Sequence, residues 1–172
     1  MIDYTQIEND LKQWIRTVCG FGGGFVISQN DNNPRPLDQY ATVKIYDAQV
    51  IGHDTFNATA APLGTVNLNY SGVRKIRIGV NIFRDGTETV QNQMAKLTSS
   101  FNRFDTQIYF KSKKMGIIES GEVIDLPELV RDKWEERKQC DFFVYVNDEE
   151  TQNVEAIEKL AGTGFGTAYQ IP

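Results

Sequence analysis

The sequence contains few of the residues that build metal centres, disulfide frameworks or membrane spans. His53 is the single histidine in 172 residues, which excludes a multi-histidine metal site and leaves little for a Ser-His-Asp triad. Cys19 and Cys140 are the only cysteines, and their apolar neighbours predict buried free thiols. No apolar run approaches the roughly 20 residues that cross a bilayer. We therefore expect no catalytic residue, no cofactor, no metal and no membrane contact.

Positive charge is also scarce, since 18 Lys and Arg stand against 23 Asp and Glu, for a net charge of −5. An acidic chain is unsuited to gripping nucleic acid over a broad surface. The hydrophobic content of 40% and the charged content of 24% are typical of a globular domain with one core. The N-terminus leads directly into an acidic amphipathic segment and does not look like a signal peptide, so we expect synthesis in a cytoplasm.

Apolar residues at helical spacing predict two main helices. In the first, over residues 5–18, the stripe consists of Ile7, Leu11, Trp14, Ile15 and Val18. Thr5 and Glu8 have the spacing of a capping box, and the glycines from Gly20 to Gly24 end this helix. In the second, over residues 87–101, the stripe consists of Val90, Met94, Leu97 and Phe101. Two shorter helices are expected at residues 126–134 and 151–160.

Alternating apolar and polar residues predict the strands, which are expected at 25–27, 40–51, 66–70, 73–84, 105–119 and 134–146. The alternation is strictest at 73–84, where the residues expected to face the core are Ile76, Ile78, Val80 and Ile82. Trp134 is expected to face inward with Cys140, Phe142 and Val144. Residues 52–64 have small side chains and a proline, and we expect a loop there.

These elements predict an α+β fold in a single domain, with a mainly antiparallel sheet flanked by two main helices and short additional helices. The sequence has no internal repeat and no linker that would separate two cores. We expect the domain to comprise residues 1–160. Residues 161–172 are Gly-rich and are expected to form a flexible C-terminal tail.

Three kinds of segment could in principle carry chemistry. The glycine-rich stretches 20–25 and 162–166 lack a Gly-Lys-Ser/Thr ending and a strand-to-helix context, so neither is a phosphate loop. The basic cluster of Lys111, Lys113 and Lys114 is either a solvated face or a positive patch that meets an acidic neighbouring subunit or passing DNA. Acidic runs such as residues 148–150 are explained as solvated surface rather than as acid–base catalysts.

One stretch of the chain reads Leu126-Pro127-Glu128-Leu129 followed by Trp134-Glu135-Glu136-Arg137 and Asp141-Phe142. With this stretch the chain resembles the neck and tail terminator proteins of tailed bacteriophages. The opening amphipathic helix and the order Pro34-Arg35-Pro36 then Tyr40-Ala41-Thr42-Val43 also resemble that family. The resemblance covers about Tyr4 to Leu160, whereas residues 52–64 and the tail fall outside it.

The resemblance implies a structural virion protein and not an enzyme. Such proteins form a ring, typically hexameric, on the head-proximal end of the tail tube, stop tube growth and join the tail to the head connector. The implied partners are further copies of the chain, the tube protein, the head–tail connector or adaptor protein and, in a contractile tail, the sheath protein. Genomic DNA would pass through without specific binding. The implied location is the virion neck, with assembly in the host cytoplasm.

A ring requires subunit interfaces, and aromatic and basic residues are suitable material for them. The candidate interface residues are Phe56, Lys111, Lys113, Lys114, Phe143, Tyr145, Phe165 and Tyr169. Three alternatives stay open from the sequence. They are another ring-forming head-completion or adaptor protein of the neck, a small cytoplasmic hydrolase that uses an acidic pair, and a ligand-binding module.

Overall fold

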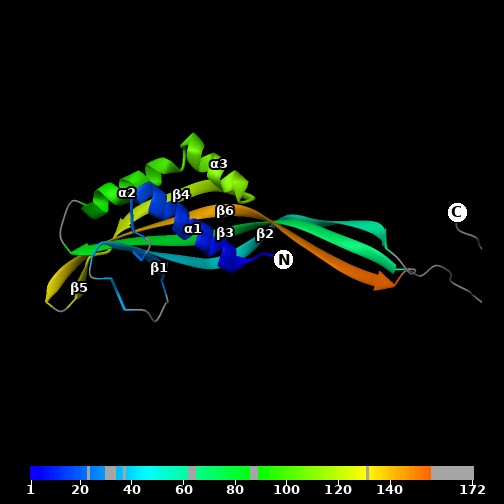
Figure 1. The fold of residues 1–172 in the computed structure, drawn as a ribbon, viewed down its shortest axis with the longest axis horizontal. Helices are drawn as coiled ribbons and strands as arrows, with labels where there is room; N and C mark the ends of the chain where they lie inside the picture. Colours follow the sequence, from blue (N-terminus) through cyan, green and yellow to red (C-terminus); the bar gives the residue numbers. More distant parts are fainter. Residues whose placement is uncertain are drawn as a thin grey trace, which may run out of the picture.

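The computed structural model describes residues 1–22, 24–29, 34–36, 38–61, 65–85, 89–130 and 132–155. The described residues form a six-stranded sheet with three helices packed on one face (Figure 1), which confirms the α+β fold expected from the sequence. The helices are α1 (Tyr4–Cys19), α2 (Thr89–Ser100) and α3 (Phe104–Ser112). The strands are β1 (Val26–Ser28), β2 (Tyr40–Ala61), β3 (Thr65–Asp85), β4 (Met115–Asp125), β5 (Glu128–Val130) and β6 (Lys133–Glu155). No described helix is long and apolar enough to cross a membrane.

The sheet is almost entirely antiparallel, with strand order β1-β2-β3-β6-β4 and with β5 paired to β6 as a hairpin. Among the described strands, only β1 and β2 pair in parallel. The register of β3 with β6 runs without a shift from Thr65 opposite Glu155 to Asp85 opposite Glu135. The register of β2 with β3 has two irregularities, one of them between Ile51 and Thr55. The two central strands, β3 and β6, are therefore paired without interruption over the full length of β3.

The core lies between the helices and the sheet face beneath them. As predicted, the alternation on β3 buries Ile76, Ile78, Val80 and Ile82 completely. Trp14 of α1 is 3% exposed, and its ring centroid lies 5.1 Å from that of Phe110 on α3 and 5.6 Å from that of Phe142 on β6. Burial of apolar side chains from all three helices and the central strands stabilises this part of the protein.

Both cysteines are buried in this core as free thiols, in agreement with the prediction. Burial raises the pKa of Cys19 to about 12 and the pKa of Cys140 to about 11. The thiolate is the reactive form of cysteine, so these thiols are chemically inert near neutral pH.

Helix α1 begins and ends with the expected residue types, but its N-cap is Asp3 and not Thr5. The Asp3 carboxylate accepts a hydrogen bond of 3.0 Å from the backbone N–H of Gln6. Asp is as good an N-cap as Ser or Thr, and it precedes Thr5 in the chain, so the helix starts earlier than predicted. Gly20 adopts a left-handed φ of 74° and donates its N–H to the Arg16 carbonyl, which ends the helix.

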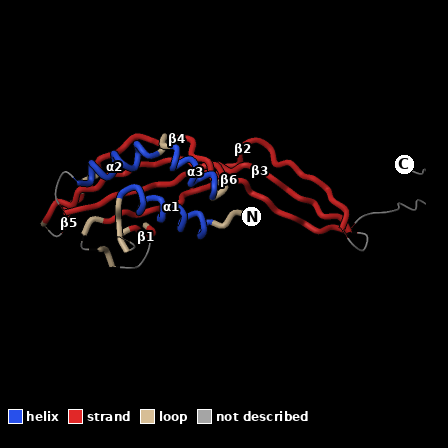
Figure 2. The backbone as a smooth tube through the Cα atoms, turned by 45° about the horizontal axis from the view of Figure 1, so that its top comes forward, coloured by secondary structure: helices blue, strands red, loops and turns tan. Residues whose placement is uncertain are grey.

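Strands β2, β3 and β6 continue far beyond the helices as a three-stranded ribbon (Figures 1 and 2). We call residues 51–61, 65–73 and 147–155 the arm, and the remaining described residues the head. In the part of the chain that the structure describes, no helix lies over either face of the arm (Figure 2). At about 3.3 Å per residue, the arm extends roughly 30 Å from the head.

Four predicted elements are wrong. Residues 52–61 belong to strand β2 and are not a loop, and residues 151–155 belong to β6 and are not a helix. In both segments a long register with β3 supplies hydrogen bonds that outweigh the local preference of small, polar residues. Residues 104–112 are helix α3 and not a strand, while the predicted helix at 126–134 is the β5–β6 hairpin. Residues 156–160 and the predicted tail at 161–172 lie outside the described residues.

Trp134 does not face the core. Its side chain is 65% exposed on the β5–β6 hairpin, although Cys140, Phe142 and Val144 on the same strand are fully buried as predicted. The alternation along β6 decides on which side of the sheet each side chain lies. Trp134 lies on the same side as Cys140, Phe142 and Val144, but the helices do not extend over the hairpin, so its side chain has no layer to pack against.

Candidate assembly surfaces

The described residues offer no constellation for catalysis or metal binding. No group of three or more His, Cys, Asp or Glu side chains within the described ranges could hold a metal ion. His53 is exposed on β2 and not in the predicted loop. A hollow of about 550 Å³ is an open depression between α3 and β4 lined by Phe110, Lys111 and Met115 among others. The surfaces that remain are suited to contacts with other chains.

One face of the arm is predominantly polar, with Ile51 and Val73 as apolar residues at its base. It carries Asn and Thr side chains from all three strands, joined by hydrogen bonds across the strands. The Thr151 hydroxyl donates to Asn69 Oδ1 at 2.8 Å, and Asn153 Nδ2 donates to Asn67 Oδ1 at 2.8 Å. Asn69 in turn donates to Thr59 on β2 at 3.3 Å. These bonds tie the three strands together on a face that is suited to water.

The opposite face of the arm is apolar on β2 and β3, whereas β6 adds Gln152 opposite Leu68 and Glu150 opposite Tyr70. Its residues stand in three cross-strand rows: Phe56 with Tyr70, Ala58 with Leu68, and Ala60 with Val66 and then Val154. Phe56 is 69% exposed, and its ring centroid lies 6.3 Å from that of Tyr70. On β3 this face has the same parity as the residues that face the core of the head. An exposed apolar sheet face of this kind marks an interaction surface.

An ion-pair cluster joins the three strands where the arm leaves the head. Arg74 of β3 makes two hydrogen bonds with the Asp54 carboxylate of β2, at 2.6 and 2.8 Å, and an ion pair of 3.3 Å with Asp148 of β6. The hydrogen bond from Arg74 lowers the pKa of Asp54. Gly72 leaves room for this cluster, because a Cβ atom there would collide with Asp54 Oδ1 and an Arg74 nitrogen. The cluster fixes the base of the arm.

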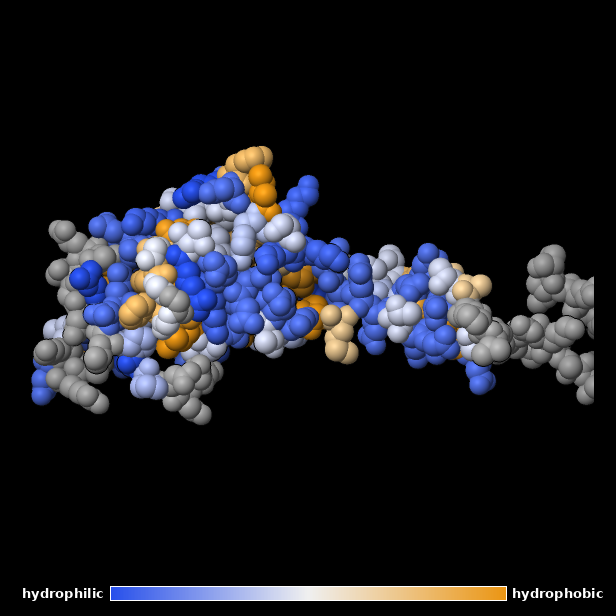
Figure 3. All heavy atoms as spheres, viewed as in Figure 1, coloured by the Kyte–Doolittle hydropathy of each residue, from blue (hydrophilic) through white to orange (hydrophobic). Residues whose placement is uncertain are grey.

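Helix α3 presents a second exposed apolar surface. Phe104 is 77% exposed and Ile108 is 52% exposed, and together with Lys111 they lie at helical spacing on one side of the helix. The other side is anchored, since Phe110 is buried and the Tyr109 hydroxyl donates to the Asp10 carbonyl at 2.8 Å. Figure 3 shows this surface as an apolar prominence over α3. We call Phe104, Ile108 and Lys111 the α3 patch.

A third exposed apolar surface lies at the opposite end of the molecule from the arm. Leu129 and Trp134 pair across the β5–β6 hairpin and are 57% and 65% exposed. The apolar residues of the neighbouring chain segment are Val123, Ile124 and Leu126, each at least 36% exposed. We call Leu129 and Trp134 the hairpin patch. The sequence pattern did not indicate that Leu129 is exposed, because its helical spacing suggested burial.

The structure separates the residues that the sequence suggested as an interface. Lys111 and Lys114 are exposed, but Lys113 is engaged in an ion pair of 2.8 Å with Asp10 of α1. Phe56 lies on the arm and Tyr145 on the head sheet, where it is 36% exposed. The predicted residue Phe143 is half-buried, with the Lys75 ammonium 4.0 Å from its ring centroid. Phe165 and Tyr169 lie outside the described residues.

An elongated chain with an amphipathic arm and further apolar patches belongs to the class of proteins that act by assembling with other chains. The family model described as phage neck terminator protein matches residues 5–168, nearly the entire sequence, and the chain belongs to this family. It is therefore a structural component of the phage neck and tail in the virion.

Among solved structures, the chain is similar to the sheath/tube terminator in the extended state of an extracellular contractile injection system, PVC. The identity is 11% and the TM-score is 0.44. The match covers 99% of this chain and 66% of that one, so the chain spans slightly less than two thirds of the solved protein. No curated protein matches the sequence.

Proposed function

We propose that the protein forms a ring, with six copies as in the family it belongs to, on the head-proximal end of the tail tube. The ring ends tube growth and joins the tail to the head connector. The observation that carries this proposal is the family match over residues 5–168. The tube protein and the connector are the proposed partners, with the sheath protein as a third in a contractile tail.

The surfaces of the chain support a ring. The arm and the hairpin patch lie at opposite ends of an elongated molecule, and the α3 patch lies between them (Figure 3). Contacts between different patches on successive copies are heterologous, and a heterologous contact that closes on itself produces a ring. Residues 161–172, which lie outside the described residues, are proposed as an additional contact element.

The net charge of the chain supports passage of DNA without binding. Six copies at −5 each make a strongly acidic ring, and like charge repels the phosphate backbone. Screening limits this repulsion to about 10 Å at moderate salt, so it acts only where the ring wall approaches the DNA.

Mass measurement under native conditions, together with electron microscopy of the protein alone and mixed with its tube protein, tests the proposal. We expect discrete multiples of the 19.5 kDa chain and rings bound to one end of each tube. In a tube assembly reaction, added protein should also shorten the tubes. A protein that binds only the connector and leaves tube length unchanged would instead be an adaptor of the neck.

A further inference from the structure

The arm repeats the sheet face of the head without its helices. In the head, the side of β3 that carries Ile76 and Ile78 is covered by helices and completely buried. In the arm, the same side of β3 carries Val66, Leu68 and Tyr70, and in the described chain no helix covers them (Figure 1). An apolar sheet face is stable when another layer packs on it. The arm therefore lacks a layer that a second chain can supply.

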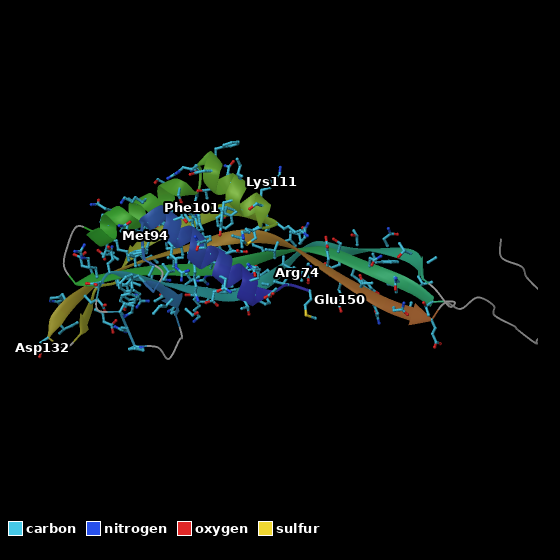
Figure 4. All side chains as sticks on the ribbon, viewed as in Figure 1. Arg74, Met94, Phe101, Lys111, Asp132 and Glu150 are labelled. Atoms are coloured by element: carbon cyan, nitrogen blue, oxygen red, sulfur yellow. The ribbon has the colours of Figure 1, made fainter. Side chains whose placement is uncertain are left out.

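The uncovered face of the arm also carries negative charge. Glu150 of β6 is exposed directly opposite Tyr70, and no ion pair of the described residues involves its carboxylate. Figure 4 shows Glu150 close to Arg74 at the base of the arm. A shallow hollow of about 270 Å³ lies here, lined by Tyr70, Arg74, Asp148 and Glu150 among others. An occupant of this face needs apolar side chains and a cation near the base of the arm.

The α3 patch has the complementary composition. Phe104 and Ile108 supply the apolar side chains, and Lys111 supplies a cation one turn further along the helix. Lys111 is exposed and makes no ion pair within the described part of the chain. The hollow of about 550 Å³ beside α3, which Lys111 also lines, offers room for a projecting aromatic ring such as that of Phe56.

Within one chain these two surfaces cannot meet. The α3 patch points away from the sheet, while the arm leaves the head as an unbroken continuation of β3 and β6 (Figure 4). The hairpin patch is a poorer match for the arm, because the acids of segment 128–135 outnumber its bases Arg131 and Lys133, whereas the α3 patch carries the single charge of Lys111. Charge complementarity thus selects α3 of a different copy.

We propose that the apolar face of the arm docks on the α3 patch of a second copy of this chain. Phe56 and Leu68 pack against Phe104 and Ile108, and Glu150 pairs with Lys111. This inference rests on the proposed function, because the contact would be the interface between neighbouring subunits of the proposed ring. Each copy gives one arm and receives one, so the contact is heterologous and can close into a ring.

Charge exchange tests this contact. We expect Glu150→Lys and Lys111→Glu each to weaken self-association about three- to tenfold, because each places like charges opposite one another. The double variant restores the pair with reversed polarity and should return to within about twofold of the unsubstituted protein. Sedimentation equilibrium of the full chain measures these constants, and circular dichroism verifies folding.

Matched controls separate this contact from a general effect of charge. Glu149→Lys makes the same change on the polar face of the arm, opposite Ser71, and Lys114→Glu makes the same change outside the α3 patch. Both controls should self-associate as the unsubstituted protein does. Phe104→Ser and Ile108→Ser, at exposed positions, should weaken association more than tenfold without loss of folding.

The outcomes distinguish this contact from the proposed function. Rings that form and cap tubes as before in both charge variants overturn the contact and leave the proposed function standing. Charge variants that lose tube binding but still form rings overturn it as well, since the arm would then serve the tube protein. Loss of association only on removal of residues 161–172 identifies the tail as the occupant. A protein that stays monomeric both alone and with tubes overturns both proposals.

Discussion

The head and the arm share the three strands β2, β3 and β6, yet they are stabilised in different ways. In the head, α1, α2 and α3 cover the sheet, and the central strand residues Ile76, Ile78 and Val80 are fully buried. In the arm, the same strands continue with hydrogen bonds between them, but the residues that would form a core lie at the surface. The head has its own hydrophobic core, whereas the apolar face of the arm has no layer packed on it within the described residues.

This comparison teaches that a strand pattern alone does not reveal which part of a sheet is a core and which part is an interface. Substitutions in the head and in the arm should therefore differ in their effect on the stability of the free chain, and four of them are given in order of decreasing effect.

The largest difference is expected between equivalent apolar truncations in the two regions. Phe142→Ala removes a fully buried ring that lies 5.1 Å from Phe101 and 5.6 Å from Trp14, and should lower the free energy of unfolding by about 3–5 kcal/mol. Leu68→Ala on the half-buried arm face should cost only about 1 kcal/mol. Chemical denaturation of both variants measures the difference. Equal losses would show that the arm is part of the folding core.

The base of the arm should tolerate little added volume. Gly72→Ala places a methyl group against Asp54 and Arg74, so we expect a loss of about 1–3 kcal/mol. The matched control is Gly116→Ala on β4, where nothing lies within 4 Å of the new Cβ atom, and we expect a change of less than about 1 kcal/mol there. If the two variants melt at the same temperature, the ion-pair cluster does not hold the arm.

The same cluster should give the arm a pH dependence. The hydrogen bond from Arg74 lowers the pKa of Asp54 in the folded chain, so its contribution is fully present above the unfolded pKa of about 3.9 and is lost as pH falls through the lowered folded value. Asp54→Asn should therefore lower the melting temperature at neutral pH and cease to matter below that value. A difference that persists unchanged at low pH would show that the carboxylate charge is not involved.

The smallest effect is expected at Trp134. Because its side chain is 65% exposed, Trp134→Ala should change the free energy of unfolding by less than about 0.5 kcal/mol, whereas Trp14→Ala, at 3% exposure, should cost about 3–5 kcal/mol. Fluorescence-detected denaturation of the two variants tests this. A loss of more than about 2 kcal/mol at Trp134 would indicate that the hairpin is packed in the free chain.

Much of the head could be predicted from the sequence, because its elements bury one side against a core. The apolar stripe of α1 and the alternation from Ile76 to Ile82 follow directly from which side chains are buried, so the sequence pattern reveals them. The arm could not be predicted in the same way. Residues 52–61 read as a loop, since their strand state depends on pairing with β3 and not on their own preference.

The candidate interface was predicted in part. Phe56 and Lys111 are exposed, and they lie on the two surfaces that we propose to meet, but the sequence could not show that they belong to different regions. Lys113 was suggested by the same basic run, yet Asp10, which is distant in the sequence, engages it. Phe104, Ile108 and Leu129 were missed, because segments 105–119 and 126–134 were assigned to the wrong element type, and exposure depends on packing between elements.

The unbroken register of β3 with β6 has a mechanical consequence. Hydrogen bonds in an antiparallel pair lie perpendicular to the strands, so tension along the arm loads the whole ladder in shear and does not open it one bond at a time. We expect the head and arm to resist stretching as a single stiff strut, which single-molecule pulling from the arm tip would measure as a high rupture force. Strands that run from one end of the subunit to the other suit a structural component of a phage neck and tail.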